Sequence, residues 1–435
     1  MVRRIISNSG ILIIEKLFSM ASTLLITVLM TRYLNIEDWG TLSYCLALVG
    51  LVSPLAALGL NSLISKELID GVYPQAKIMG TAIFLRMFGA FLGAISLIFF
   101  SKFFFVSNDE LMYVISLSIG SLFLSLTGVS FYFESLVLAK YVSIARTFAI
   151  VISFVIKLAA IYYQAEFKTI IFIFSCDFVF QGVFLLLAYS YHANDITKWR
   201  FDWSLAKSLL SKSYWLIFSS LCAVLYLKVD QVMLGKLTSM EEVGYYALAA
   251  KFSEVWYFIP NAIMASCYPI LIKVKSKSIV DYNMRLQQTC DILFLLSLSL
   301  AIFIQLFSPW IITHIFGVAY EKVTGILIIH IWASIFVFMR AVASKWLIVE
   351  GLLKYSLWSQ GIGAIVNITF NAILIPSYGA IGASYATIIS YAFASWFAFY
   401  IYKDTRLVAN MMLRSFLIPY RLIKKLCSLF RSYLY

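Results

Sequence analysis

Charged side chains are scarce in this chain of 435 residues. Asp, Glu, Lys and Arg make up 13% of it, and hydrophobic residues make up 62%. A soluble globular protein carries about 25% charged and about 45–50% apolar residues, so this chain has too few charges to cover a water-facing surface. The apolar residues extend over the whole chain and leave no segment for a separate soluble domain. The composition excludes a soluble enzyme, a disordered protein and an ordinary nucleic-acid binder, and it predicts a polytopic membrane protein.

Residues that carry catalytic chemistry are also few. The three histidines are isolated from one another, and the sequence contains no Walker A loop, no H-E-x-x-H and no G-x-S-x-G motif. The six cysteines lie at wide spacings, most of them within apolar runs, which is typical of small buried residues and not of disulfides or metal ligands. We therefore expect no catalytic residue, no metal site and no cofactor, and we do not expect an enzyme.

Apolar stretches long enough to cross a bilayer recur along the chain. A hydrocarbon core about 30 Å thick needs about 20 apolar helical residues. This length predicts an all-α polytopic membrane protein. Its transmembrane helices, about twelve in number, are expected at 10–33, 41–64, 78–103, 111–138, 141–163, 169–191, 212–235, 243–272, 287–307, 323–349, 356–376 and 380–402.

The order of these segments predicts four parts. A bundle of six helices occupies 1–191, a cytoplasmic linker 192–211, and a second bundle of six helices 212–403. The remaining residues, 404–435, form a basic tail with Leu, Phe and Tyr between the charges. That pattern is typical of an amphipathic helix on the anionic inner leaflet, so membrane lipids are expected partners of the tail.

The net charge of +13 is explained by membrane topology. With the N-terminus inside, roughly 21 Lys and Arg residues fall on the inner side and roughly 5 on the outer side, as the positive-inside rule requires. This distribution predicts that both termini are cytoplasmic. It also removes the need for a nucleic-acid partner.

An internal repeat supports two equivalent halves. The pattern R-x-L-x-x-E-D-x-G at 32–40 resembles K-L-x-x-x-E-E-x-G at 236–244, and each follows the first span of a six-span half. Parallel repeats related by an axis along the membrane normal are one arrangement found in transporters. We therefore expect two pseudo-symmetric six-helix bundles around a central cavity.

Apart from the Lys and Arg residues assigned to the two surfaces, fourteen ionisable residues fall within the predicted spans. At about 3 kcal/mol each, exposing them to lipid would cost on the order of 40 kcal/mol, so they must face one another or water. Arg146, Ser153 and Lys157 share one stripe of the fifth span, and Gln360, Asn367 and Asn371 repeat that spacing in the eleventh. Such stripes predict a hydrated cavity.

The depth of the buried charges predicts two ion pairs, Lys157 with Asp177 and Asp291 with Lys345; a purely structural role fits each pair equally well. Cationic residues without an obvious neutralising partner are candidates for binding an anionic group. The substrate-binding candidates, including two amides, are Arg86, Arg146, Lys157, Lys228, Arg340, Asn367 and Asn371. The candidates for coupling to a proton or sodium gradient are Asp177, Asp230, Glu254 and Asp291.

Several short motifs carry a family resemblance that covers nearly the whole chain. They are I-I-E-K at 13–16, T-R-Y-L at 31–34, L-G-L-N at 58–61, D-Q-V-M-L-G at 230–235, and N-x-x-L-I-P-x-x-G-x-x-G-A at 371–383. Together they resemble the O-antigen flippases, the Wzx-type polysaccharide transporters of the multidrug/oligosaccharidyl-lipid/polysaccharide exporter superfamily. The D-Q-V-M-L-G stretch is the most specific of them.

This resemblance implies a function as well as a fold. Two six-helix bundles about a central cationic cavity would move a polyprenyl-diphosphate-linked oligosaccharide from the cytoplasmic to the outer leaflet of a bacterial inner membrane, for O-antigen, lipopolysaccharide or another surface polysaccharide. A polysaccharide polymerase and a chain-length regulator are further implied partners. No catalytic residues come with the family.

Two other functions remain open. A small-molecule or drug cation antiporter of the same superfamily would share the fold but have a narrow, acidic cavity. A polytopic polymerase or glycosyltransferase would need a large outer loop with acidic residues or histidine, and the sequence has no such loop.

Overall fold

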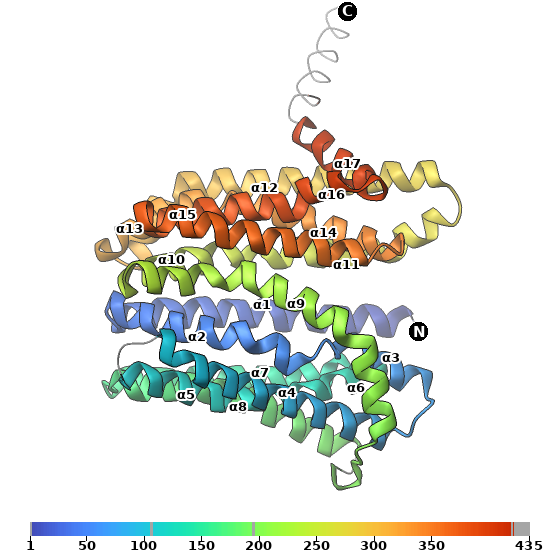
Figure 1. Ribbon diagram of the computed structural model, residues 1–435, viewed down its shortest axis with the longest axis horizontal. Helices are drawn as coiled ribbons and strands as arrows, with labels where there is room; N and C mark the ends of the chain where they lie inside the picture. Colours follow the sequence, from blue (N-terminus) through green and yellow to red (C-terminus); the bar gives the residue numbers. More distant parts are fainter. Residues whose placement is uncertain (1, 105–107, 194–195, 419–420, 422–435) are drawn as a thin grey trace, which may run out of the picture. The chain divides into compact units, whose positions relative to one another are not determined.

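The computed structural model of the chain describes residues 2–104, 108–193, 196–418 and 421, and this part contains helices and no strands. The α-helices are α1 (Val2–Tyr33), α2 (Ile36–Ala57), α3 (Asn61–Asp70), α4 (Gln75–Phe104), α5 (Asn108–Leu122), α6 (Ser130–Ser135), α7 (Ala139–Tyr162), α8 (Phe167–Ala193), α9 (Trp203–Leu237), α10 (Met240–Glu254), α11 (Phe258–Lys275), α12 (Ile279–Ile315), α13 (Glu321–His330), α14 (Ala333–Val349), α15 (Lys354–Ala392), α16 (Ala398–Ile401) and α17 (Arg406–Phe416) (Figure 1). The shorter helical segments are η1 (Phe123–Val129), η2 (Ile196–Lys198), η3 (Val255–Tyr257), η4 (Val318–Tyr320), the π-helix η5 (Phe393–Phe397) and η6 (Lys403–Thr405). Of the predicted tail, 419–420 and 422–435 lie outside the described residues.

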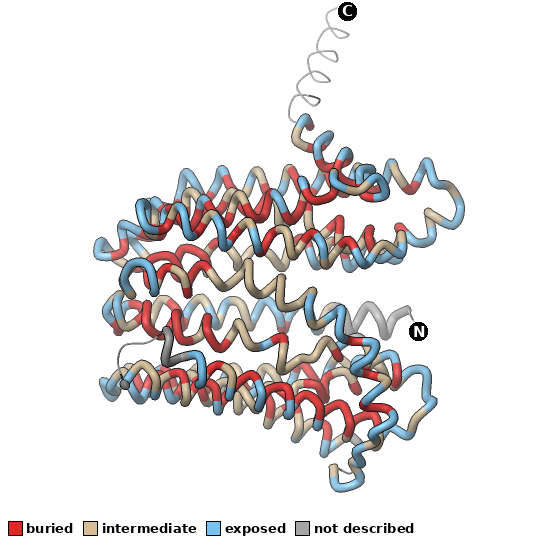
Figure 2. The backbone as a smooth tube through the Cα atoms, viewed as in Figure 1, coloured by how far each residue is buried: buried red, intermediate tan, exposed pale blue. Residues whose placement is uncertain are grey.

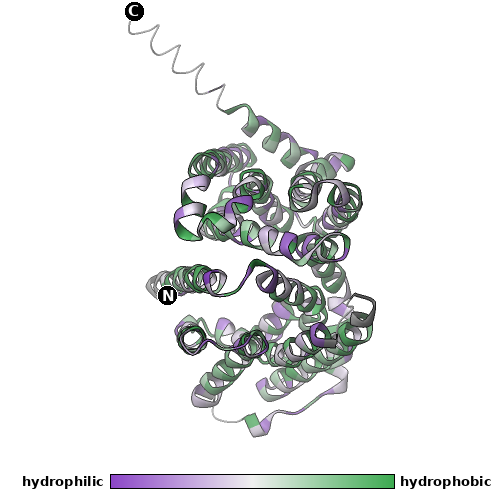
Figure 3. Ribbon diagram, turned by 90° about the vertical axis from the view of Figure 1, so that its left-hand side faces the viewer, coloured by the Kyte–Doolittle hydropathy of each residue, from purple (hydrophilic) through white to green (hydrophobic). Residues whose placement is uncertain are grey.

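Ten helices of the described chain are long and apolar enough to cross a membrane. An eleventh crossing is counted when the bent pair Val318–His330 and Ala333–Val349, which meet at 44°, is taken as one span. Exposed and half-exposed residues recur along these helices (Figure 2), and apolar residues extend along them (Figure 3). The side chains of Phe84, Phe99 and Val155 are each more than half exposed. Soluble proteins rarely expose such apolar area. The chain is therefore an all-helical, multi-pass membrane protein, as its composition predicts.

Helix α15 folds back on itself at Gly379, whose backbone leaves the helical region with φ 53° and ψ −133°. Asn367 donates a hydrogen bond of 3.2 Å to Ser390, 23 positions further along the chain. In a straight helix these residues would be about 35 Å apart, so α15 consists of two antiparallel arms. The predicted spans 356–376 and 380–402 lie on these arms.

The contacts within the chain define two compact units, which are described separately. The first, Met1–Gly244, includes α1 to α9. Its largest apolar core lies where α3, α4, α6, α8 and α9 meet, and its fully buried members include Leu60, Ile64, Met79, Phe133 and Leu205. Helix α9 belongs to this unit because it packs along α2, where a Cβ atom on Gly235 would lie 2.5 Å from the ring of Tyr44. The unit boundary therefore follows Gly244 and does not coincide with the predicted linker at 192–211.

The second unit, Tyr245–Tyr435, has its main core between α11, α12, α14 and α17. The fully buried members of this core include Leu286, Leu293, Phe338, Leu347 and Met412. Helix α17 thus contributes to the core of the unit, and this part of the predicted tail is a packed structural element.

The two glycines of the internal repeat lie against each other's helices within the first unit. A Cβ atom on Gly40 of α2 would lie 1.8 Å from the carbonyl oxygen of Met240, and one on Gly244 would lie 2.4 Å from the carbonyl oxygen of Ile36. The N-terminal turns of α2 and α10 therefore cross at a distance that only glycine permits.

We expect Gly40→Ala to destabilise the protein by about 1–3 kcal/mol, because the added methyl group forces two helix backbones apart. The midpoint of thermal unfolding in detergent measures the effect. Gly50→Ala, in the same helix, is the matched control, since the nearest atom to its Cβ would be Lys228 Cγ at 3.8 Å. Equal midpoints for the two variants would contradict the proposed close contact.

The segment before α9 is fixed to the start of α4 by polar contacts. Asp202 caps α9 by accepting a hydrogen bond from the Leu205 N–H, and its other carboxylate oxygen lies 2.9 Å from Lys77 Nζ. The Asp202 N–H in turn donates to Thr81. The backbone hydrogen bond from Leu205 and the Lys77 ammonium lower the pKa of Asp202 below its ordinary value.

This lowered pKa predicts an acid-sensitive attachment. Because the folded state holds the carboxylate in its charged form, the attachment is complete above the ordinary pKa of Asp and is lost as the pH falls through the lowered value. Limited proteolysis between 196 and 203 should therefore accelerate only in strong acid. Asp202→Asn should show the accelerated rate at neutral pH as well; cleavage of this variant at the wild-type rate would rule out the role of the carboxylate.

Candidate functional site

A polar pocket of about 140 Å³ lies within the first unit, among α1, α7 and α8. Its polar lining consists of hydroxyl, amide and charged side chains, in a part of the molecule whose helices are otherwise apolar. These residues are Ser19, Ser22, Thr23, Ser153, Lys157, Asp177 and Gln181. Of the stripe predicted on the fifth span, Ser153 and Lys157 line this pocket and Arg146 does not; the pocket is our candidate functional site.

The charged centre of the pocket is the ion pair between Lys157 of α7 and Asp177 of α8. The pair predicted from sequence is therefore confirmed. Ser153, one turn before Lys157, donates a hydrogen bond to the other carboxylate oxygen of Asp177. The Lys157 ammonium also lies 4.1 Å from the centre of the Phe174 ring, within cation–π distance.

Because the pair is buried, each of its two charges depends on the other for neutralisation. Lys157 is 4% exposed, and the pair carries no net charge. Removing one member of a buried pair leaves an uncompensated charge, which costs about 3–5 kcal/mol, whereas replacing both by apolar residues is often tolerated.

Some residues of the site were not predicted from the sequence. The sequence could have indicated Ser22, which lies three residues after Ser19, but the contact of Lys157 with Phe174 depends on packing.

Arg146 lies two helical turns before Ser153 on α7 and faces α1. Its guanidinium is 4.0 Å from the Glu15 carboxylate, at the limit of an ion pair, and its side chain is 38% exposed. The contact of Arg146 with Glu15 is longer than the ion pair of Lys157 with Asp177, and the Arg146 side chain is partly exposed. It can therefore still accept a stronger anionic ligand.

Arg86 of α4 is buried, 6% exposed, and held by neutral groups. It donates to the side chain of Asn61 at 2.6 Å, to the carbonyl of Ser125 at 3.0 Å and to the hydroxyl of Thr127 at 3.3 Å. Ser125 and Thr127 belong to η1, a 3₁₀ segment inserted between α5 and α6. The arginine thereby ties α3, α4 and η1 together.

Three further candidates lie on α9 and α10. Asp230 is buried, whereas Lys228 and Glu254 are half-buried. None of them lines the pocket formed by α1, α7 and α8.

In the second unit, Arg340 of α14 is also held by neutral acceptors. It donates to the Ser359 hydroxyl at 2.6 Å, to the Ser356 hydroxyl at 3.1 Å and to the carbonyl of Ala394 at 2.9 Å. Ala394 belongs to the π-helix η5, whose wider turn leaves a carbonyl available to a side chain. Arg340 thus bridges α14 to both arms of the α15 hairpin.

The two predicted amides form a buried chain along the hairpin. Asn371 donates to Asn367 at 3.0 Å, and Asn367 donates to Ser390 on the second arm. On that arm, the Thr387 hydroxyl lies 2.9 Å from the hydroxyl of Tyr246. Both amides are fully buried, so the polar stripe predicted here lies in the interior of the second unit.

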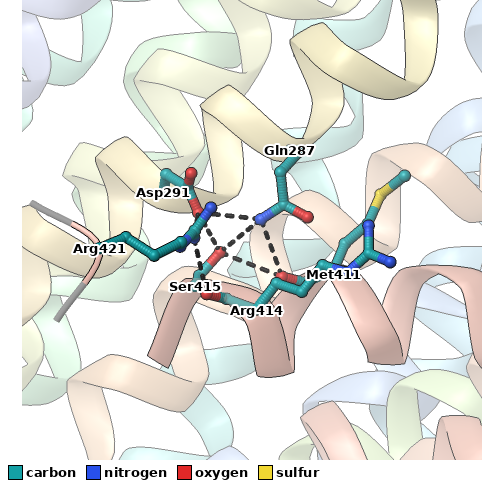
Figure 4. A network of polar contacts seen from close by, with 6 residues as sticks. All are labelled: Gln287, Asp291, Met411, Arg414, Ser415 and Arg421. Atoms are coloured by element: carbon teal, nitrogen blue, oxygen red, sulfur yellow. Dashed lines mark hydrogen bonds and ion pairs between the residues drawn. The ribbon is translucent and has the colours of Figure 1, made fainter. Parts of the chain in front are cut away.

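Asp291 differs from its sequence prediction. It accepts hydrogen bonds from Gln287 at 2.9 Å and Ser415 at 2.7 Å and lies 3.0 Å from the Arg421 guanidinium (Figure 4). The predicted pair with Lys345 is therefore wrong; the Lys345 ammonium lies over the ring of Tyr268 instead. Similar depth in the membrane did not make them neighbours, because Asp291 is engaged by Gln287 of its own helix, by Ser415 of α17 and by Arg421 beyond α17.

The fold and the buried polar groups together define a multi-pass membrane protein of a known transporter fold. The chain superposes on a structure described as "Lipid II flippase MurJ, inward closed conformation" with a TM-score of 0.71 and 15% identity, over 95% of this chain and 92% of that one. An inward-facing multidrug resistance MATE family transporter of the MOP superfamily matches with a TM-score of 0.66 and 13% identity, over 91% and 96% of the two chains.

A family described as "Polysaccharide biosynthesis protein" matches residues 5–275, more than half of the chain. The chain therefore belongs to the polysaccharide biosynthesis protein family, in agreement with the resemblance seen in its motifs. It is also 21% identical over 399 residues to the "Probable low-salt glycan biosynthesis flippase Agl15" of Haloferax volcanii, which covers 88% of this chain and 80% of that protein.

The buried pair of Lys157 and Asp177 predicts how substitutions of these two residues change the stability of the protein. We expect Lys157→Met and Asp177→Leu to lower the thermal midpoint in detergent by an amount corresponding to about 3–5 kcal/mol each, because each leaves one buried charge alone. The double variant should recover most of this loss. Ser19→Ala, which removes a pocket hydroxyl and no charge, serves as the control. Strictly additive losses in the double variant would argue against the pairing.

Proposed function

We propose that this protein is a flippase for a polyprenyl-diphosphate-linked oligosaccharide, which it moves from the cytoplasmic to the outer leaflet by alternating access. The product would feed the synthesis of O-antigen, lipopolysaccharide or a similar surface polysaccharide. The family match supports this proposal, and two similar proteins bear names that describe flippases, one in glycan biosynthesis and one for lipid II.

The observation that carries the proposal is the set of polar and charged side chains held inside apolar helical units, among them the lining of the pocket at Lys157 and Asp177. A sugar head group and its diphosphate cannot enter hydrocarbon without partners that replace water. Hydroxyl, amide and charged side chains supply such partners. Membrane helices that served only as anchors would not need them.

The size of the pocket limits what it can hold. At about 140 Å³ it is smaller than the roughly 300–1,000 Å³ of typical ligand sites. It therefore suits one small polar group or ion, and the oligosaccharide would pass through a wider central cavity. We assign Asp177 to proton or sodium coupling, with Asp230, Glu254 and Asp291 as the other candidates carried forward from the sequence.

We propose that the cationic candidates bind the anionic part of the substrate. Their contacts within the protein indicate which of them are most available to it. Lys157 lines the pocket, whereas Arg146, two helical turns before Ser153 on the same helix, is the more available because of its long contact with Glu15. Arg86, Lys228 and Arg340, with the amides Asn367 and Asn371, would line or support the central cavity.

We further propose twelve membrane crossings in two six-helix bundles around that cavity, in the inner membrane, with both termini in the cytoplasm. The ten long helices, the bent pair and the second arm of α15 together supply twelve crossings. The excess of Lys and Arg on one side supports the orientation. A polymerase and a chain-length regulator would act on the same substrate.

A cation antiporter is the second candidate function. The MATE transporters share the fold, and the pocket is small and contains a carboxylate, as that function requires. The two functions differ in what accumulates when the protein is lost. Deletion of the gene should leave lipid-linked repeat units on the cytoplasmic face if the protein is a flippase; unchanged repeat units with greater sensitivity to cationic drugs would instead indicate the antiporter.

In the deletion strain, we expect Arg146→Ala and Arg340→Ala to reduce delivery of lipid-linked sugar to the outer leaflet by about tenfold or more, since a charge-assisted hydrogen bond contributes about 1.5–3 kcal/mol. Labelling of outer-leaflet sugar at equal protein level measures this. Arg285→Ala, an exposed arginine at the start of α12, is the matched control. Full delivery by both variants would exclude these residues from substrate binding.

A further inference from the structure

Helix α17 packs against the rest of the second unit through one face. Val408, Ala409, Met411 and Met412 are buried on this face. At its end, the Phe416 ring packs among other rings, with centre-to-centre distances of 4.9 Å to Phe294 and 5.4 Å to Trp396. Its position against α12 is therefore set by both apolar and aromatic contacts.

A polar clasp centred on Asp291 fixes the same helix (Figure 4). Gln287 of α12 donates to the Met411 carbonyl at 3.0 Å and to the Ser415 hydroxyl at 3.1 Å. Arg421 contacts Asp291 and also donates to the Arg414 carbonyl at 2.6 Å. The last turn of α17 is thus held to α12 by several hydrogen bonds and one ion pair.

The clasp lies where α12 changes from polar to apolar. Asp291 is the last charged residue before the stretch 292–307, which contains none, whereas Asp281 and Arg285 precede it. Such a change marks the boundary between water and hydrocarbon along a membrane helix. Helix α17, attached at that point, is therefore at the membrane interface.

The outward face of α17 combines cationic and apolar side chains. Leu407, Leu413 and Leu417 are 45%, 42% and 56% exposed, and Arg406 and Arg414, each next to one of these leucines, are also exposed. Lys403 precedes them and is exposed as well. The nearby acidic residue, Asp404, accepts a hydrogen bond of 2.6 Å from the Tyr355 hydroxyl, so its carboxylate is engaged within the unit.

We propose that this outward face binds anionic phospholipid, with the leucines among the acyl chains and Lys403, Arg406 and Arg414 at the phosphates. The charge of the face complements a negative head group, and interfacial helices combine these residue types. A protein partner fits less well. The eleven residues of α17 make a helix about 16 Å long and about 10 Å wide, far smaller than the roughly 800 Å² that each side of a stable protein complex buries.

This inference does not depend on the transported substrate, and it is tested without transport. The full chain is placed in nanodiscs of phosphatidylcholine, with or without phosphatidylglycerol, and amide hydrogen exchange is measured over 403–417. Phosphatidylglycerol should slow amide exchange by about fivefold or more. Each basic residue at an anionic surface contributes roughly 1 kcal/mol of binding free energy, which corresponds to a change of about that size. High salt should weaken the protection.

The triple variant Lys403→Gln, Arg406→Gln, Arg414→Gln should lose this lipid dependence. The matched control removes three other exposed lysines of the second unit, Lys273→Gln, Lys277→Gln and Lys354→Gln, and should keep it. Equal exchange of the wild-type chain in the two lipids, or undiminished protection in the α17 variant, would overturn the proposal. Protection that appears only in native membranes, with no dependence on lipid charge, would assign the face to a protein partner instead.

Asp291→Asn tests the clasp separately. Because it removes the ion pair with Arg421 but no residue of the outward face, it should speed exchange over 403–417 in both lipids while leaving the ratio between them unchanged. Loss of the ratio as well would show that the clasp orients the lipid-binding face, and exchange identical to the wild type would remove the clasp from the proposal.

Discussion

A charge inside a bilayer must find its partners within the protein, because hydrocarbon offers none. Most of this structure follows from that constraint. Lys157 has the carboxylate of Asp177 and the face of Phe174, and Asp177 has the Ser153 hydroxyl in addition. Each partner comes from α7 or α8, so the positions of these helices are tied to the charges they enclose.

The same constraint explains the irregular helices. An arginine has five N–H donors, and a regular α-helix has few carbonyls to spare because each is bonded four residues ahead. Arg86 donates to the 3₁₀ segment η1 as well as to Asn61, and Arg340 donates to the π-helix η5 as well as to Ser356 and Ser359. In both units a break in helical regularity accompanies an arginine that is held inside the unit, buried for Arg86 and half-buried for Arg340. These distortions are part of how the membrane interior tolerates positive charge.

Charge pairing also bears on transport. A flippase has to offer its substrate polar partners without leaving them uncompensated when the substrate is gone. Under the proposed function, a pair such as Arg146 with Glu15, at 4.0 Å, would meet both needs, because the arginine has a carboxylate nearby at rest and its contact is long enough to be exchanged for a stronger anion. Arg86, with several short bonds to neutral groups, is better suited to holding helices than to releasing a ligand.

The sequence by itself determined the class of protein, because membrane spans are specified by length and hydropathy, which are local properties. It also indicated the pair of Lys157 with Asp177, since adjacent antiparallel spans place residues of equal depth side by side. Equal depth gave a wrong prediction for Asp291 and Lys345, because two partners of Asp291, Ser415 and Arg421, lie more than 120 residues away along the chain. Only the tertiary structure decided that α9 packs with the first unit, that the amide stripe of Asn367 and Asn371 is buried, and which cations are engaged. These features depend on contacts between residues distant in sequence, and no local pattern encodes them.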